Sequence, residues 1–163
     1  MDVSSSLIAV GASGLQAVVW MPNGSGGWNA PTFVGDSGSR VNSINNAGTI
    51  AVGHARGPLG SIVAAYWTNT GGTWSGPTIL LDGTCARADA VDDAGHIRLK
   101  DCLAVGQPAV SSPPYTSTST TMLVGLGDPG TATSALNMST HGTVVVGTTT
   151  LKGVQTAVYW PLP

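Results

Sequence analysis

The stretch VNSINNAGTIAVG (residues 41–53) contains the pattern that decides the fold of this chain. Its first residues, VNSI (41–44), are predicted to form a strand that runs into a turn. The NNAG segment (45–48) predicts a tight turn, because Asn and Gly tolerate positive φ. The continuous apolar segment IAVG (50–53) predicts a second strand with both faces buried. The stretch therefore predicts two antiparallel strands joined by a short turn.

The elements of this stretch recur along the chain at a spacing of about 47 residues. The turn segment recurs as ADAVDDAG (88–95) and, less closely, as SALNMSTHG (134–142). The apolar segment is found in IAVGAS (8–13), IAVGHA (50–55), LAVGQP (103–108) and VVVGTT (144–149). A third element ends in tryptophan and is found as QAVVW (16–20), VAAYW (63–67) and TAVYW (156–160). Such a period indicates a repeat architecture.

Each period is predicted to contain four short strands, the fourth of which follows a Gly-rich turn. Four strands in about 40–50 residues are typical of one blade of a β-propeller. We therefore expect an all-β, β-propeller-like array of four-stranded antiparallel blades, with about three and a half repeats of about 47 residues. The chain is expected to begin at the second strand of its first unit. It would form a single repeat domain (1–163) with units at about 7–39, 40–86, 87–132 and 133–163.

The composition favours short strands and turns, and it argues against several classes of function. Only 9% of the residues are charged, and 23 Gly and 10 Pro interrupt the chain. The net charge of −2 argues against a nucleic-acid partner. No apolar run reaches the length of about 18 residues that a membrane span needs, and no cofactor motif occurs, so no cofactor is expected. The N-terminal stretch MDVSSSLIAVGASG lacks the basic region and the long apolar region of a signal peptide.

Two stretches resemble a known repeat family. They are SINNAGTIAVG (43–53) followed by AAYW, and LVGLGDPGTATSALNMSTHGTVVVG (123–147) followed by AVYW. Both are similar to HAF repeats, whose pattern runs roughly D-L-G, S-x-A, I-N-x-x-G-x-V-V-G and H-A-x-x-W. This chain departs from the last step, where Ala17, Ala64 and Ala157 have no preceding His. The resemblance implies a β-propeller-like domain in an extracellular or periplasmic location, with no established activity and no catalytic residues.

The segment GDSG (35–38) raises Ser37 as a candidate nucleophile, because the same tetrapeptide surrounds the catalytic serine of trypsin-like proteases. In register with the other units, Ser37 corresponds to Thr84 and Pro129. A proline at this position indicates a turn former and not a hydroxyl nucleophile. The chain order also differs, since such proteases place His before Ser and the first histidine here is His54. We expect Ser37 to lie in a turn.

The third unit is expected to carry an insertion of about six residues, IRLKDC (97–102) or nearby, because Gly95 to Gly106 spans eleven residues against five in the sister units. Cys102 lies in this insertion, and Cys85 takes a place that is glycine in the sister turns. Two departures that are both cysteine indicate a Cys85–Cys102 disulfide that ties the inserted loop to the preceding turn. Two unrelated buried thiols are the alternative.

Charged residues concentrate in the same unit. Five aspartates and three basic residues lie between 82 and 102: Asp82, Asp89, Asp92, Asp93, Asp101, Arg87, Arg98 and Lys100. A weak Ca²⁺ site is one interpretation. The D-x-D-x-D-G pattern is absent, however, and Asp92 occupies the structural Asn position of the turn, so we expect a solvated, salt-bridged loop and no metal site. His96 is expected to be an exposed turn residue, because no zinc motif contains it.

The five tryptophans fall into two groups. Three share one repeat position and are expected in the core between blades: Trp20, Trp67 and Trp160. Trp28 and Trp74 follow the hairpin turns and are candidates for stacking on a sugar. Asn23 and Asn69, in those turns, are candidates for hydrogen bonds to the same ligand.

The sequence favours a binding module over an enzyme. The first prediction is a non-catalytic, extracellular repeat module of the β-propeller type that binds a glycan or a protein. The alternative is a propeller-type carbohydrate-active hydrolase or lyase that uses the Asp-rich third unit. Such enzymes need charged groups that converge from several blades, whereas here the charges lie in one unit.

The number of blades also has a consequence for assembly. Three and a half blades are too few for an ordinary closed propeller, and a compact four-bladed ring without two edge strands is the smallest alternative. An open array would leave strand edges and apolar faces exposed. We therefore expect either a fragment of a larger propeller or a chain that closes by self-association.

Overall fold

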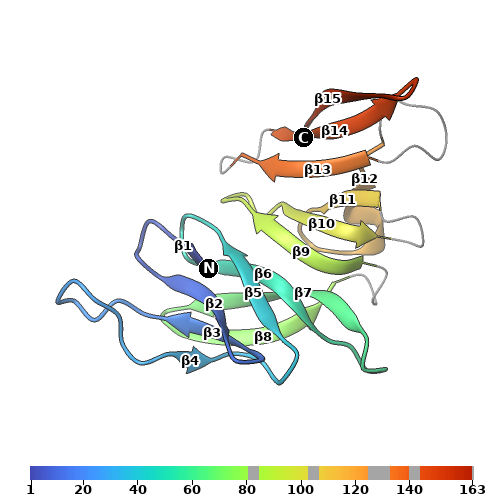
Figure 1. The fold of residues 1–163 in the computed structure, drawn as a ribbon. Coiled ribbons are helices and arrows are strands. Elements are labelled where there is room, and N and C mark those ends of the chain that lie inside the picture. The colour runs from blue at the N-terminus through green and yellow to red at the C-terminus, as the bar shows by residue number, and fades with distance from the viewer. Residues whose placement is uncertain (81–84, 103–106, 125–132, 140–143, 163) are drawn as a thin grey trace.

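The computed structural model describes residues 1–80, 85–102, 107–124, 133–139 and 144–162. Within them every regular element is a strand except one short 3₁₀ turn, η2 (Ser117–Ser119). The strands form four antiparallel sheets, each made from one continuous stretch of chain. Figure 1 shows these sheets arranged in chain order, from the blue N-terminal sheet to the red C-terminal sheet. The prediction of an all-β chain of antiparallel sheets is confirmed.

In each sheet the strands lie side by side in chain order. The first sheet consists of β1 (Asp2–Val3), β2 (Ala9–Ser13), β3 (Gln16–Trp20) and β4 (Thr32–Phe33). The second sheet consists of β5 (Arg40–Ile44), β6 (Ile50–Arg56), β7 (Ile62–Thr70) and β8 (Thr73–Ile79). The third sheet consists of β9 (Cys85–Val91), β10 (Ile97–Cys102), β11 (Gln107–Ser111) and β12 (Thr120–Met122). The fourth sheet consists of β13 (Thr133–Met138), β14 (Val144–Leu151) and β15 (Val154–Pro161).

The predicted turn between β5 and β6 is held by the side chain of Asn45. Its Oδ1 accepts a hydrogen bond from the backbone N–H of Thr49 at 2.9 Å. Gly48 in the same turn has a φ of 73°, which favours glycine. Asp92 has the same role in the third sheet, where its Oδ1 accepts from the N–H of His96 at 2.8 Å. The prediction that Asp92 stands in the structural Asn position is confirmed.

Both faces of the second sheet are buried. On β6, Ala51 belongs to a core shared with the first sheet, and Val52 belongs to a core shared with the third sheet. Both residues are 0% exposed. On β7, Ala65 and Ala64 are divided between the same two cores. A continuous apolar strand suits this sandwiched position, so the prediction for IAVG (50–53) is confirmed.

Two strand assignments made from the sequence were wrong. Residues 97–102, expected as an inserted loop, form β10 and pair with both β9 and β11, with Ile97 and Leu99 0% exposed. The similarity of LAVG (103–106) to IAVG had placed the second strand too late, and residues 103–106 lie outside the described residues. Asp2–Val3 also pairs with β2, so the first sheet begins with its first strand and not its second.

The first strand of each later sheet packs against several strands of the sheet before it. β5 lies against β1, β2 and β3, β9 against β5, β6 and β7, and β13 against β9 and β11, whereas the last strands β4, β8 and β12 take little part. A cavity of about 220 Å³, the central cavity, lies among these first strands. Each of the four sheets contributes to its wall, through Asp2, Ser43, Val91 and Met138 among others. Asp2 also fastens β1 to β5, because its Oδ2 accepts a hydrogen bond from the Ser43 hydroxyl at 2.8 Å.

The stack has an open end at the fourth sheet. Val146 and Tyr159 are partners across β14 and β15, and they are 43% and 71% exposed, whereas Val145 on the other face is buried. Among the described residues, no sheet closes on itself and no helix is long and apolar enough to cross a membrane. The structure therefore establishes a stack of antiparallel sheets, and the propeller stays a prediction.

Candidate functional site

A groove of about 660 Å³ lies between the outer strands of the first and second sheets. Residues of β3, β4 and the turn after β4 form one side, and residues of β8 form the other. Its aromatic and polar side chains come from Phe33, Trp74, Gln16, Thr32, Asp36 and Thr73. We call it the aromatic groove. Its size lies within the range of about 300–1,000 Å³ that is usual for small-molecule sites.

Trp74, one of the predicted sugar-stacking residues, lines this groove from β8. Its ring also packs against the core of the first two sheets, as do Met21 and Val34. The indole N–H is covered and has no hydrogen-bond partner among the described residues. A buried donor without a partner costs about 1–3 kcal/mol. Trp74 is thus a half-buried wall of a groove, and not an exposed platform.

Phe33 contributes the exposed aromatic ring of the groove. It is the only phenylalanine of the chain, it lies on the short strand β4, and it is 55% exposed. Phe33 was not among the ligand-binding residues predicted from the sequence. The available signal was a single large aromatic residue placed two positions before the GDSG turn (35–38).

Three hydrogen bonds fix the hairpin and turn on which the groove depends. The Trp67 indole N–H donates to the Val34 carbonyl at 2.7 Å and ties β7 to the end of β4. The Asn69 amide donates through Nδ2 to the Gly48 carbonyl at 3.0 Å. Its Oδ1 accepts from the Gly72 N–H at 2.9 Å. Both ends of the Asn69 amide, predicted to bind a ligand, are therefore used to hold the β7–β8 hairpin.

Trp28 and Asn23 do not line the aromatic groove. Trp28 is 46% exposed, and its indole N–H donates to the Leu7 carbonyl at 2.7 Å. The Oδ1 of Asn23 accepts from the N–H groups of Ser25 at 2.9 Å and Gly27 at 3.0 Å, which fixes the loop between β3 and β4. Of the four predicted ligand-binding residues, the structure places only Trp74 in this groove.

The tryptophans predicted for the core differ in burial. Trp67 is 0% exposed, whereas Trp20 and Trp160 are half-buried. The Trp160 indole N–H donates to the Val124 carbonyl at 3.0 Å, just as Trp67 donates to Val34. Each of these two bonds ties the third strand of one sheet to the end of the preceding sheet.

Ser37 lies in the turn between β4 and β5, as predicted. The next residue, Gly38, has a φ of 90°, and the Ser37 carbonyl accepts a hydrogen bond from Arg56 Nε at 3.2 Å. The corresponding positions Thr84 and Pro129 lie outside the described residues.

The side chains of Asp92 and His96 are in direct contact at the β9–β10 turn. The Asp92 side chain is 0% exposed, and its Oδ2 lies 2.7 Å from His96 Nδ1. The expectation that His96 is an exposed turn residue was therefore wrong, because its ring turns inward to the buried carboxylate.

The other acidic side chains of the third sheet face different partners. Asp93 accepts a hydrogen bond from the Ala47 N–H at 3.0 Å, and Asp89 lies 3.8 Å from Arg98 Nη2. In the part of the chain that the structure describes, no three His, Cys, Asp or Glu residues gather into a metal-binding group. Asp82 lies outside that part.

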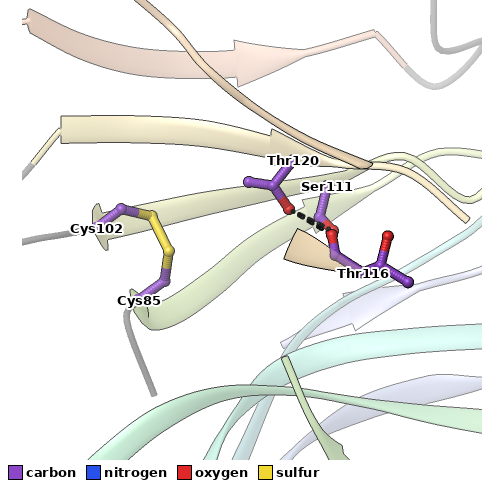
Figure 2. Close-up of a disulfide and its surroundings, with 5 residues drawn as sticks. All are labelled: Cys85, Cys102, Ser111, Thr116 and Thr120. Atoms are coloured by element: carbon purple, nitrogen blue, oxygen red, sulfur yellow. Dashed lines mark hydrogen bonds between the residues drawn. A yellow bond between two sulfur atoms is a disulfide. The ribbon is translucent and has the colours of Figure 1, made fainter. Parts of the chain in front are cut away.

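Cys85 and Cys102 form a disulfide, which Figure 2 shows at one end of the third sheet. They are the first residue of β9 and the last residue of β10, and they are direct partners across these strands. The bond therefore joins two paired strands, and not an inserted loop and a turn. In the same sheet, the Thr120 hydroxyl donates to Ser111 Oγ at 3.1 Å and links β12 to β11 (Figure 2).

No family model matches the chain, and neither does any curated protein or solved structure. The residues and geometry of the grooves therefore carry the proposals that follow.

Proposed function

We propose that this chain is a non-catalytic binding module whose aromatic groove takes a neutral glycan. The observation that carries the proposal is one groove of about 660 Å³ that combines Trp74 and Phe33 with polar side chains such as Gln16, Thr32 and Asp36. Aromatic rings provide flat apolar surfaces for the C–H faces of sugars. Amide and hydroxyl groups donate and accept hydrogen bonds and a carboxylate accepts them, so each of them can bind a sugar hydroxyl.

The charge of the groove favours a neutral ligand. Asp36 is the only charged side chain among the described lining residues. The covered N–H of Trp74 is a further donor that a sugar hydroxyl would satisfy after a small movement of the ring. A protein partner would need a contact surface of about 800 Å² per side, and Phe33 is the only large exposed apolar side chain among the described lining residues.

A titration with a panel of neutral oligosaccharides tests the proposal. Phe33→Ala removes an exposed ring without opening the core, and Trp74→Phe keeps the core filled but removes the indole. Both variants should weaken binding of the best ligand about tenfold or more, which corresponds to about 1.4 kcal/mol. Trp28→Ala is the matched control, because Trp28 is an exposed tryptophan outside the groove.

Two outcomes would overturn this assignment. Loss of binding in Trp28→Ala with full binding in Phe33→Ala would place the site on the β3–β4 loop. Binding of a protein with no affinity for any neutral glycan would show that the ligand class is wrong. Far-UV circular dichroism of each variant separates these outcomes from loss of folding.

We further propose that the stack is a propeller-like repeat array that a second copy of the chain completes. The first strand of each later sheet packs against the preceding sheet, and the four first strands line the central cavity, which is an arrangement that blades around an axis would give. The exposed Val146 and Tyr159 of the fourth sheet provide an apolar face of the kind that the inner sheets bury.

An extracellular or periplasmic location is part of the same proposal. The HAF resemblance supports it, and a disulfide such as Cys85–Cys102 persists in oxidising compartments. We do not propose the hydrolase or lyase alternative, because Asp89, Asp92 and Asp93 each face a different partner.

A further inference from the structure

A second groove, of about 420 Å³, lies where the first three sheets meet. Leu15, at the β2–β3 hairpin, contributes from the first sheet. Arg40 and His54 contribute from β5 and β6 of the second sheet, and Arg87 and Asp89 from β9 of the third sheet. We call it the arginine groove. Its described lining residues are all different from those of the aromatic groove.

Positive charge dominates the arginine groove. The chain has only six Lys and Arg residues, and two of them, Arg40 and Arg87, line this one groove. Both are exposed, and neither forms a hydrogen bond through its side chain or an ion pair with any described residue. Asp89 is the only acidic side chain among the described lining residues.

Asp89 is engaged by a third arginine, Arg98, on β10. The Arg98 side chain is 10% exposed, and its Nη2 lies 3.8 Å from Asp89 Oδ2. Burial lowers the pKa of Arg98, and Asp89 acts in the opposite direction. A buried guanidinium needs a nearby carboxylate to offset its lost hydration. Asp89 thus lies between the groove and Arg98, and two arginines against one aspartate leave the arginine groove with an excess of positive charge.

Both arginines that line the groove affect the pKa of the His54 imidazole. It pairs with Arg40 across β5 and β6, and its Nδ1 is covered and has no partner among the described residues. Burial lowers the pKa of His54, Arg87 and Arg40 lower it further, and Asp89 opposes them. The two guanidinium groups thus raise the local potential at the same imidazole.

The backbone fixes Arg40 and Arg87 relative to each other. They are 47 residues apart, near the starts of β5 and β9. Asn42 and Asp89, two positions further on, are the extra residues at the β-bulges of these strands. Bulges re-aim side chains and are frequent beside binding sites. The Asn42 Nδ2 donates to the Ala88 carbonyl at 2.9 Å and so joins the two bulged strands directly.

We propose that the arginine groove binds a small oxyanion group, the carboxylate, sulfate or phosphate of a ligand, between Arg40 and Arg87. A planar guanidinium donates paired N–H groups that match such oxygens. An anion bound in the groove is attracted by both cations. The volume of about 420 Å³ suits a group the size of one or two sugar or amino-acid units. This inference stands independently of the aromatic groove.

The test follows the His54 imidazole by NMR during pH titrations at constant ionic strength in chloride. The probes are inorganic sulfate, inorganic phosphate and glucuronate, with glucose as the neutral control. We expect bound oxyanions to raise the pKa of His54 and to leave the resonances of His96, which is paired with Asp92, unchanged. A response to sulfate and phosphate alone identifies an inorganic ligand, and a response to glucuronate identifies a carboxylate-bearing one.

Arginine variants decide whether the groove is the site. Arg40→Gln and Arg87→Gln should each weaken the affinity for the responding anion about tenfold or more, as expected for a charge-assisted hydrogen bond. Lys152→Gln is the control, because it removes one exposed positive charge from the β14–β15 turn. Since Arg40 and Arg87 are exposed, both variants should keep the circular dichroism spectrum and Tm of the wild type.

The proposal is overturned if no oxyanion shifts the pKa of His54 beyond the effect of chloride. It is equally overturned if Lys152→Gln weakens binding as much as the arginine variants, because the ion is then held by general surface charge.

Discussion

Breaking the Cys85–Cys102 disulfide is expected to destabilise the third sheet and the core that it shares with the second sheet. The two cysteines are 17 positions apart in the sequence. A cross-link that closes a loop of this length lowers the entropy of the unfolded chain and contributes about 3 kcal/mol at about 25 °C. For a chain of 163 residues, each 1 kcal/mol shifts Tm by about 2–4 °C. The expected fall in Tm is therefore about 6–12 °C.

Because both cysteines are buried, the expected loss of stability on reduction comes mainly from the loss of the cross-link. Cys85 is 2% exposed and Cys102 is 1% exposed, and both lie in the core that contains Val52 and Leu99. Reduction leaves two thiols in nearly the same volume, and a buried thiol packs as a small apolar group. The apolar area buried in the folded protein therefore changes little on reduction.

Thermal unfolding followed by circular dichroism, with and without dithiothreitol, measures the effect. The double variant Cys85→Ala/Cys102→Ala is the control for the reductant, because its Tm should be low in both conditions. Hydrogen exchange should lose protection first in β9 and β10, which the bond joins. Equal Tm values for the oxidised and reduced wild type, within about 1 °C, would refute the loop-closure argument.

Three other perturbations test the rest of the structure. Gly53→Ala should lower the free energy of unfolding, measured in urea, by more than about 3 kcal/mol, because a Cβ would overlap the backbone carbonyl of Arg40. Gly11→Ala is the control at the same IAVG position of the first sheet, and it should lower this free energy by less than about 1 kcal/mol. Equal losses in the two variants would contradict this account. Burial, with smaller effects of a neighbouring tyrosine and aspartate, raises the pKa of Tyr115 from 10.0 to about 12. The stability that the neutral Tyr115 side chain contributes is present below pH 10.0 and is lost as the pH rises towards about 12. Over this range the urea midpoint should therefore fall less steeply in Tyr115→Phe than in the wild type. Parallel plots of urea midpoint against pH for the two proteins would contradict the pKa shift. Tyr159→Ser, on the open face of the fourth sheet, should reduce self-association in gel filtration, and a wild type that is monomeric at every concentration would refute closure by a second copy.

Local chemistry explains what the sequence predicted correctly. Asn45 and Asp92 accept hydrogen bonds from N–H groups four residues further along the chain, so neighbouring residues alone determine their role. Gly48 and Gly95 have φ values of 73° and 85° in the same turns. These turns limit the strands between them, which is why the all-β class could be predicted.

Pairing between strands explains what the sequence did not predict. LAVG (103–106) resembles the apolar strands elsewhere, yet Ile97 and Leu99 are the residues that pair with β9. The burial of the strand IRLKDC (97–102) is not evident from its sequence, because three of its six residues are charged: Arg98, Lys100 and Asp101. A charged residue suits a buried strand only when its partner, here Asp89, is known, and that partner lies on another strand.

The grooves depend on contacts between sheets, and these contacts are even harder to predict from the local sequence than strand pairing is. The 47-residue spacing of Arg40 and Arg87 could be read from the sequence, but their convergence on one groove depends on how the second sheet packs against the third. Phe33 and Trp74 likewise come from two sheets. Repeat spacing therefore predicts equivalent positions, and only the packing of sheets shows which of them share a site.

Equivalent positions in the 47-residue spacing have two different physical roles. Asn45 and Asp92 satisfy backbone groups, so the fold itself accounts for them. Arg40 and Arg87 form no side-chain hydrogen bond or ion pair with the described residues, so the fold does not account for them. Both side chains are exposed and line one groove. An oxyanion bound between them would give both guanidinium groups a partner of opposite charge, and this is the role that we propose for them.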